Sequence, residues 1–347
     1  MQSLLVTGGA GFIGSNFVRY MLDQHSHCTV TVLDKLTYAG NIDNLQDVAQ
    51  NPRFHFVQGD ICDAGVVNQA IKGCNMVVNF AAETHVDRSI VEPGGFVITD
   101  VYGTYTLLEA ARQAEVERFI QISTDEVYGD ACSPEGVSRP SLETDALMPR
   151  SPYAASKAGA DRLAFSYWAT YGLPVIITRC SNNYGPYQYP EKQLPLFIVS
   201  AIEGRSLPIY GDGSSTRDWL HVHDHCVALD FLLHAPGTMV HGEIFNIGSG
   251  EEYSILDNAR AILQLLNLSS KLLCFVADRP GHVRRHAINT EKLRTKLGWR
   301  PKREFATGLH ETIVWYQTQR DWLANIVARQ DSFLHGALHL ANDGAIP

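Results

Sequence analysis

A glycine-rich turn directly after the first apolar segment constrains the fold of this chain more than any other feature. Residues 4–6 are Leu-Leu-Val, and Gly8, Gly11 and Gly14 follow at a spacing of three. Glycines at these positions permit a tight turn and bring the first amides of the next helix close to a pyrophosphate. The pattern predicts a strand, a turn and a helix over residues 12–22, which is the first unit of a dinucleotide-binding fold.

Short apolar segments alternate with helical patterns through the first half of the chain. The predicted strands lie at residues 4–6, 29–33, 54–57, 76–80, 118–122 and 175–178. Nearly continuous apolar strands separated by helices are typical of a parallel sheet that is covered on both faces. We therefore predict the α/β class, with a doubly wound parallel (Rossmann) sheet.

The sequence changes character after about residue 181, where turn clusters interrupt shorter segments. Helical spacing returns at residues 226–233, 254–266 and 308–319. These features predict a smaller C-terminal α/β domain that binds the substrate. We expect the cofactor domain at residues 1–180, with segments near 218–247 returning to it, the substrate domain at 181–217 and 248–322, and a tail of unknown role at 323–347.

Composition excludes several classes of protein. No segment of the 347 residues approaches the 18 consecutive apolar residues of a membrane span. The formal net charge of −9 speaks against nucleic acid as a partner. Seven cysteines lie far apart without a C-x-x-C pair, and the N-terminus runs into an apolar strand without a basic region. We therefore predict reduced thiols and a cytoplasmic location.

An acidic residue follows the glycine motif at the spacing that a ribose-binding carboxylate requires. Asp34 ends the second predicted strand, 20 positions after Gly14. A carboxylate there binds the ribose 2′-hydroxyl and repels a 2′-phosphate, so NAD is favoured over NADP. Asp60 and Ile61 follow the third strand, and residues 81–85 follow the fourth, at the sheet edge where such folds bind ligands.

A tyrosine and a lysine stand four residues apart in a predicted helix. Tyr153 and Lys157 share one helical face, and Pro152 suits a helix start. A positive charge about 4 Å away, at an effective dielectric of about 20, stabilises phenolate by roughly 4 kcal/mol, or about three pKa units. We therefore expect Tyr153 to take a proton from a sugar hydroxyl, with the oxidised nicotinamide adding a second positive charge.

Two adjacent carboxylates follow the fifth predicted strand. Thr124 provides a hydroxyl for a substrate oxygen, as an oxidoreductase of this architecture requires, but that chemistry gives no role to Asp125 and Glu126. Eliminating water from a sugar needs both a base and an acid. Like-charge repulsion and burial would let one of the two keep its proton. The pair therefore predicts a dehydration.

At this point the chain resembles a known family. Residues 8–14, 123–129 and 153–157 are similar to those of extended short-chain dehydrogenase/reductases. Residues 124–126, 179–186 and 278–282 resemble the dTDP-glucose 4,6-dehydratases among them. The resemblance covers residues 1–320, with no catalytic residue missing, whereas residues 131–148 and the tail are individual to this chain. It implies a homodimer with tightly held NAD and dTDP-glucose as the substrate.

The resemblance also implies a mechanism. Tyr153, supported by Lys157 and Thr124, takes the proton of the C4 hydroxyl while hydride passes to NAD. Glu126 then removes the C5 hydrogen, and Asp125 protonates the departing C6 hydroxyl. The hydride returns to C6, which gives dTDP-4-keto-6-deoxy-D-glucose and water.

The remaining site residues are likewise implied by the resemblance. The expected cofactor-binding residues are Gly8, Gly11, Phe12, Ile13, Gly14, Asp34, Lys35, Leu36, Thr37, Asp60, Ile61, Ala81, Ala82, Glu83, Thr99, Tyr153, Lys157 and Asn183. The expected substrate-binding residues are Thr84, His85, Thr124, Asn182, Lys192, Gln193, Leu194, Pro208, Ile209, Tyr210, Arg217, Asn246, Asp278, Arg279 and His282. Among these, Arg217 offers a planar fork to phosphate oxygens, and Tyr210 can pack against a pyrimidine.

Several alternatives stay open. His221, His223 and His225 alternate as if on one strand face and suggest zinc, but no other ligand set completes such a site, so we predict no metal. A UDP-glucose 4,6-dehydratase stays open, because one methyl group distinguishes thymine from uracil and is worth only about 1–3 kcal/mol. A sugar-nucleotide 4-epimerase would use Tyr153 and Lys157 but has no step for the acidic pair. A catalytically silent NAD-binding regulator is the alternative from another class.

Overall fold

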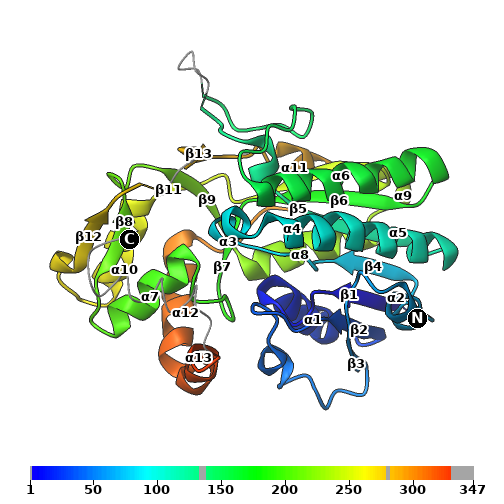
Figure 1. Cartoon of the computed structure of the whole chain (residues 1–347), viewed down its shortest axis with the longest axis horizontal. Coiled ribbons are helices and arrows are strands. Elements are labelled where there is room, and N and C mark those ends of the chain that lie inside the picture. Colours follow the sequence, from blue (N-terminus) through cyan, green and yellow to red (C-terminus); the bar gives the residue numbers. More distant parts are fainter. Residues whose placement is uncertain (1, 133–137, 279–281, 330–347) are drawn as a thin grey trace.

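Seven parallel strands form the main sheet of the computed structural model, which describes residues 2–132, 138–278 and 282–329 (Figure 1). Across the sheet the order is β10-β6-β5-β4-β1-β2-β3. The strands are β1 (Gln2–Thr7), β2 (Cys28–Asp34), β3 (Phe54–Gln58), β4 (Met76–Asn79), β5 (Arg118–Thr124), β6 (Val175–Cys180) and β10 (Ile244–Ile247). The predicted α/β class with a parallel Rossmann-like sheet is confirmed, and β10 returns to the sheet from the C-terminal half, beside β6.

Helices cover both faces of the main sheet because each strand supplies apolar side chains to both. Leu4 and Val6 pack with α1 and α8 on one face, whereas Leu5 packs with α2, α5 and α6 on the other. The helical segments are α1 (Phe12–Gln24), η1 (Ile42–Leu45), α2 (Ala64–Ala70), α3 (Val86–Val91), α4 (Pro93–Phe96), the π-helical η2 (Val97–Gly103), α5 (Thr104–Gln113), the 3-10 turn η3 (Asp125–Tyr128), α6 (Pro152–Tyr171) and α8 (Val222–His234).

A smaller lobe, to the left in Figure 1, has its own apolar core between helices α7, α10, α12 and α13. The helical segments of this lobe are α7 (Gln193–Ile202), α10 (Ile255–Leu265), η4 (Ser270–Leu272), α12 (Phe305–Thr318) and α13 (Arg320–Val327). Two further helices of the C-terminal half, α9 (Gly237–Val240) and α11 (Glu291–Leu297), lie beside the main sheet. Two small sheets complete the lobe, formed by β7 (Asn182–Tyr184), β9 (Thr216–His221), β11 (Glu252–Ser254) and β13 (Arg285–His286), and by β8 (Leu207–Tyr210) with β12 (Leu273–Val276).

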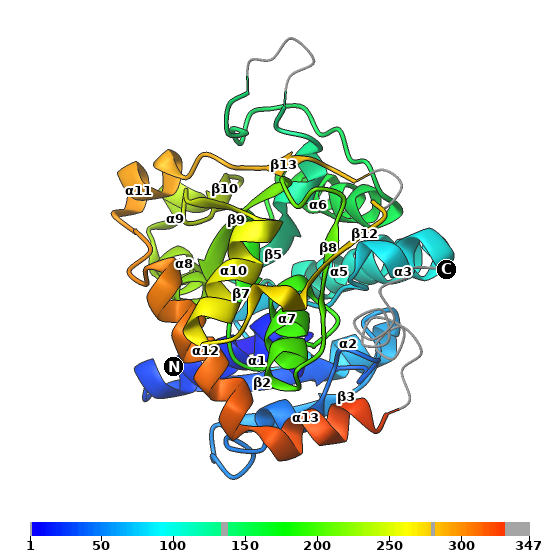
Figure 2. The same cartoon turned by 90° about the vertical axis from the view of Figure 1, so that its left-hand side faces the viewer.

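The start of the predicted tail is helical. Trp322 in α13 is buried, and its Nε1 donates a hydrogen bond of 2.7 Å to Oδ1 of Asn44 in η1. In Figure 2, which faces the smaller lobe, α13 follows α12 along the lower end of that lobe, and Figure 1 shows that α13 lies apart from β3. Helix α13 therefore connects the smaller lobe to the first half of the chain, while residues 330–347 lie outside the described residues. Within the described part of the chain, none of the helices is long and apolar enough to cross a bilayer.

Candidate active site

A cavity of about 850 Å³ lies at the carboxyl ends of the main-sheet strands and continues into the smaller lobe. The structure brings most of the predicted site residues to its walls. From the cofactor group it is lined by Gly8, Gly11, Phe12, Ile13, Gly14, Asp34, Lys35, Thr37, Asp60, Ile61, Ala81, Ala82, Glu83, Thr99, Tyr153, Lys157 and Asn183. From the catalytic and substrate groups it is lined by Thr84, His85, Thr124, Asp125, Glu126, Asn182, Lys192, Gln193, Pro208, Tyr210, Arg217 and His282.

The glycine turn is shaped by close backbone contacts. A Cβ atom at Gly14 would lie 2.4 Å from the carbonyl oxygen of Gly8, so a side chain there would push the turn and helix α1 apart. At Gly11 an added Cβ would have only that same oxygen within 4 Å, and Gly11 lines the cavity. A side chain at Gly11 would therefore fill space before the amino end of α1, where a pyrophosphate fits. This cradle suits a dinucleotide.

The predicted ribose-binding carboxylate lies at the end of β2, where the sequence spacing places it. Asp34 ends β2, and its two oxygens accept hydrogen bonds from the backbone amides of Ala10, at 2.9 Å, and Leu36, at 2.8 Å. Burial raises the pKa of Asp34, and these two bonds oppose the rise. Lys35 forms an ion pair of 2.8 Å with Asp60, so two further predicted cofactor residues contact each other at this end of the cavity.

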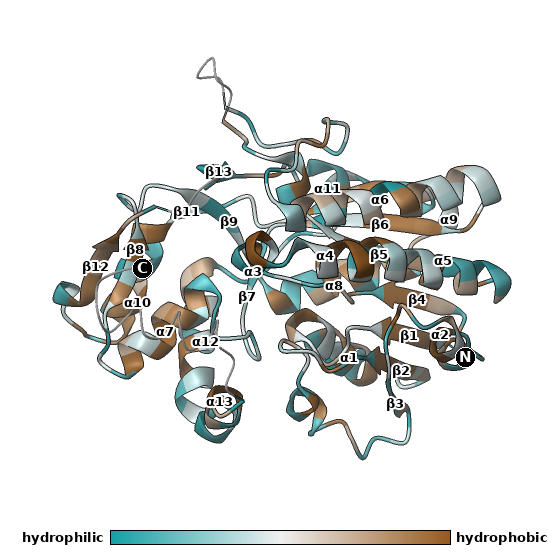
Figure 3. Ribbon diagram, in the orientation of Figure 1, coloured by the Kyte–Doolittle hydropathy of each residue, from teal (hydrophilic) through white to brown (hydrophobic). Residues whose placement is uncertain are grey.

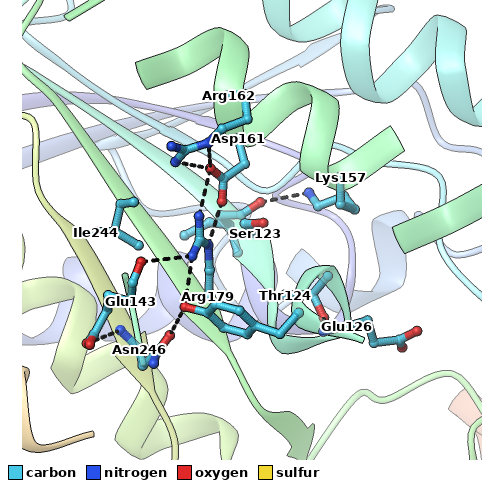
Figure 4. Close-up of polar contacts among 12 residues, drawn as sticks. Ser123, Thr124, Glu126, Glu143, Lys157, Asp161, Arg162, Arg179, Ile244 and Asn246 are labelled. Carbon is cyan, nitrogen blue, oxygen red and sulfur yellow. Dashed lines mark hydrogen bonds and ion pairs between the residues drawn. The ribbon is translucent and has the colours of Figure 1, made fainter. Parts of the chain in front are cut away.

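Helix α6 carries the predicted base and its lysine. Ser151 caps the helix by accepting a hydrogen bond from the amide of Ala154, and Pro152 occupies the first turn, as predicted. Lys157 is buried, and its Nζ donates a hydrogen bond of 2.7 Å to the carbonyl oxygen of Ile122 in β5 (Figure 4). Both Tyr153 and Lys157 line the cavity.

The pKa of Tyr153 was expected to be lowered by Lys157, and this expectation is wrong for the protein without bound cofactor. Burial raises its pKa well above 10, the charges of Glu126 and Asp100 raise it further, and a hydrogen bond with Thr124 opposes them. Burial also lowers the pKa of Lys157. The prediction placed a positive charge about 4 Å from the phenol at an effective dielectric of about 20. In the fold, the ammonium donates its hydrogen bond to the carbonyl oxygen of Ile122, and both groups are desolvated.

The two acidic residues form a short 3-10 turn at the end of β5. Thr124 caps this turn, and its Oγ1 accepts a hydrogen bond of 3.3 Å from the amide of Glu126. Asp125 is 3% exposed. Burial, together with the charges of Glu126 and Asp218, raises the pKa of Asp125 to about 8. Asp125 therefore carries a proton at neutral pH, and it lines the same cavity as Glu126.

Charged and aromatic side chains surround the substrate end of the cavity. Lys192 Nζ donates a hydrogen bond of 3.3 Å to Oγ1 of Thr84. Burial lowers the pKa of Lys192, and the charge of Glu126 is among those that oppose this decrease. Arg217 is held by the backbone carbonyls of Thr216, at 2.7 Å, and Val283, at 2.9 Å. These bonds fix one guanidinium edge, which leaves Arg217 oriented on the cavity wall.

Five predicted residues do not line the cavity, and a sixth lies outside the described residues. Leu194 and Ile209 are fully buried in the core of the smaller lobe, where their apolar side chains belong. Leu36 offers its backbone amide to Asp34. Asp278 pairs with Nδ1 of His282 at 2.6 Å. The prediction for Arg279 falls among the residues that the structure does not describe.

Asn246 is the fifth of these residues, and the structure gives it a different role. Its side chain accepts a hydrogen bond of 2.8 Å from Tyr128 and donates to the carbonyls of Ser141 and Asn289. Tyr128 in turn contacts Arg179, which is 1% exposed (Figure 4). The Asn246 amide is therefore used inside the protein, between β10 and the loop at residue 141.

The alternating histidines do not share a strand face. Strand β9 ends at His221, which caps helix α8 by accepting a hydrogen bond from the amide of His223. His225 is fully buried, and its Nδ1 lies 3.0 Å from Oδ1 of Asn183. Burial lowers the pKa of His225 to about 3, so it is neutral and orients Asn183 toward the cavity.

The structure also adds residues that the sequence reasoning missed. Cys180 ends β6, Ser181 follows it, and both line the cavity; the rule that ligands bind at strand ends could have found them. Glu191 lines it as well and pairs with Arg88 at 2.7 Å. Arg88 lies over the ring of Tyr38, 3.5 Å from its centroid. No motif indicates this second group, because its members meet only in the fold.

The comparisons with known proteins show the family of this chain. A sequence model of the family described as GDP-mannose 4,6 dehydratase matches residues 5–312. The chain belongs to this family. It is 48% identical to the dTDP-glucose 4,6-dehydratase of Streptomyces niveus, over 92% of this chain and 94% of that protein. It is 50% identical to the low-salt glycan biosynthesis protein Agl12 of Haloferax volcanii, over 91% and 98%.

A solved structure of this dehydratase family is similar throughout. DesIV of Streptomyces venezuelae, a dTDP-glucose 4,6-dehydratase crystallised with NAD and dTDP bound, superposes with a TM-score of 0.89. Its sequence is 47% identical, and the match covers 94% of this chain and 100% of DesIV. The resemblance to dTDP-glucose 4,6-dehydratases noted in the sequence is confirmed.

Proposed function

We propose that this member of the dehydratase family converts dTDP-D-glucose into dTDP-4-keto-6-deoxy-D-glucose and water. One observation carries the proposal. Asp125, protonated at neutral pH, stands beside Glu126 on the wall of the cavity that also holds Tyr153. An enzyme that only moved hydride to and from C4 would have no use for a second acid–base pair, whereas elimination of water needs one.

We assign the proton transfers to residues by their environment. Tyr153 receives the C4 hydroxyl proton, and Thr124, which bonds to it, holds the same oxygen. Glu126 removes the C5 hydrogen that the C4 ketone acidifies. Asp125 gives its proton to the C6 hydroxyl as water leaves, because burial has kept that proton on the carboxyl.

NAD fits the other end of the cavity. Bound there, it supplies a reversible acceptor for the hydride of C4, which is afterwards delivered to C6. The glycine turn leaves space before the amino end of α1 for its pyrophosphate, and Asp34 is placed for the adenosine ribose. Lys157 adds a positive charge next to Tyr153 that opposes the effect of burial on the phenol.

Incubation of the purified protein with dTDP-glucose and, separately, with UDP-glucose tests the function. We expect a product lighter by one water, with a C4 ketone and a C6 methyl group by NMR, and faster turnover of the thymidine substrate. Preference for UDP-glucose would assign the protein to the uridine-specific reaction. A C4 epimer without loss of water would indicate an epimerase. Cofactor binding without any conversion would support a silent regulator.

We also propose that the protein is a homodimer. Exposed apolar side chains follow one another along η2 and α5: Val97, Ile98, Tyr102 and Tyr105 are 43–58% exposed. Figure 3 shows apolar residues continuing over neighbouring helices α3 and α4. A second copy packed there would cover a surface that single chains rarely expose. Light scattering should give twice the chain mass, and Ile98→Glu should lower it, whereas an unchanged mass would contradict this interface.

The predicted division into a cofactor domain (1–180, with segments near 218–247) and a nucleotide-sugar domain (181–217 and 248–322) is retained as part of this proposal. The cytoplasmic location stays a prediction.

A further inference from the structure

Asp100 is a buried carboxylate that the mechanism above does not use. It lies in the π-helical turn η2, is 1% exposed, and follows Thr99 of the cavity wall. Its Oδ1 accepts a hydrogen bond of 2.9 Å from the backbone amide of Glu83, in the cofactor loop after β4. Its Oδ2 lies 2.5 Å from the hydroxyl of Ser156, between Tyr153 and Lys157 in α6. Asp100 thus joins the cofactor loop to the catalytic helix.

The hydrogen bonds around Ser156 can be satisfied with Asp100 either charged or protonated. The Ser156 hydroxyl has one proton but two acceptors, Oδ2 of Asp100 and the carbonyl oxygen of Tyr153 at 2.8 Å. When it donates to Tyr153, a protonated Asp100 preserves the other contact. Burial raises the pKa of Asp100 to about 6. The charged form therefore predominates at neutral pH, and the protonated form predominates below about pH 6.

Lys157 needs a counter-charge, since a buried ammonium is stable only beside a negative group. The carboxylates that act on it are those of Asp100 and Asp161. Asp161 already forms ion pairs with Arg179, at 2.8 Å, and with Arg162. The third group that faces Lys157 is the thiol of Cys180, whose pKa burial raises to about 12, so it is neutral. Asp100 is therefore the carboxylate whose charge is left to act on Lys157, without a direct ion pair between the two in the described part of the chain.

We propose that Asp100 is a positioning residue of the dehydratase: it is the counter-charge of Lys157 and fixes helix α6 against the cofactor loop through Ser156 and Glu83. This inference rests on the proposed function. The charged and titratable groups that face Asp100 are Lys157 and Tyr153 from α6, Glu83 from the loop after β4, and Cys62 from the loop after β3. Removing its negative charge lowers the pKa of Lys157 and of Tyr153 alike.

Asp100→Asn tests this proposal, because the amide has the shape of the carboxyl and can satisfy both neighbours. Its oxygen accepts from Glu83 and its nitrogen donates to Ser156. We expect the acidic and the alkaline limbs of the pH profile of kcat with dTDP-glucose both to move to lower pH by roughly one unit. The maximum value of kcat should stay similar. Ser156→Ala, the matched variant, keeps the charge, so its alkaline limb stays in place. A purely structural role would lower the maximum without moving the limbs, and that result overturns the proposal.

A second measurement needs no turnover. Unfolding temperatures of wild type, Asp100→Asn, Lys157→Met and the double variant form a double-mutant cycle at neutral pH. We expect the two single changes not to add, because each removes the partner of the other. Additive changes would overturn the counter-charge role. If the wild type converts no nucleotide sugar, the proposed function fails while this cycle still decides the inference.

Discussion

Asp125→Asn should make the protein more stable while it disables the dehydration. The carboxyl has a pKa of about 8 in the fold and an ordinary value of 3.8. The folded state therefore binds more protons than the unfolded chain between these values, and its stability falls as the pH rises from about 4 to 8. The loss amounts to roughly 1.4 kcal/mol per pH unit, or at most about 4 kcal/mol at pH 7.

The amide cannot ionise, so the variant escapes this loss. We expect wild type and Asp125→Asn to be equally stable near pH 4, and the variant to be more stable by up to about 4 kcal/mol at pH 7. Urea unfolding between pH 4 and pH 8 measures the difference. Asp23→Asn, at an exposed position, is the matched control and should follow the wild type. Parallel pH dependence of wild type and Asp125→Asn would refute the buried, protonated acid.

The kinetic result should separate the two stages of the reaction. Asp125→Asn retains Tyr153 and Lys157, so oxidation at C4 should proceed, while water loss slows by roughly 10²–10⁴-fold without its acid. In a single turnover the absorbance of reduced cofactor should then rise and persist, although in the wild type it is brief. Unchanged turnover, or a variant that never reduces its cofactor, would contradict the assignment of Asp125 to the second stage.

Three other substitutions probe the proposed base, the second carboxylate and a buried ion pair. Tyr153→Phe should lower turnover by roughly 10²–10⁴-fold with no rise in reduced cofactor, because the C4 hydroxyl proton has no acceptor; near-normal turnover would reject the tyrosine as base. In heavy water the wild-type product should carry deuterium at C5. Glu126→Gln should slow that labelling more than it slows cofactor reduction, whereas labelling at the same rate as in the wild type would mean that another group is the base. Arg179→Met leaves Asp161 buried beside Arg162 alone and should destabilise the fold by about 3–5 kcal/mol in urea unfolding; a change below about 1 kcal/mol would show that the buried pair contributes little.

The fold, and the meeting of the proposed catalytic residues in one cavity, were predictable because their signals are local. The glycine turn, the apolar strands and the spacing from Gly14 to Asp34 follow from backbone geometry over short distances, and the structure places them as expected. Asn246 was misplaced because its partners, Tyr128 and the carbonyls of Ser141 and Asn289, come from distant segments. A sequence shows that an amide is present, but which side of a strand end it faces depends on tertiary contacts.

Protonation states depend even more on the fold, and the base and the acid show this in opposite ways. For Tyr153 the sequence indicated a lowered pKa from Lys157, but burial and two nearby carboxylates reverse the direction. For Asp125 the same factors, burial and a neighbouring carboxylate, raise the pKa and supply the proton that the elimination needs. In the same cavity, desolvation keeps a proton on both groups, which suits Asp125 as an acid and hinders Tyr153 as a base. In the proposed mechanism, the first proton transfer therefore needs positive charge beside the phenol, which Lys157 and a bound oxidised nicotinamide would supply, whereas the second uses a proton that the fold already holds.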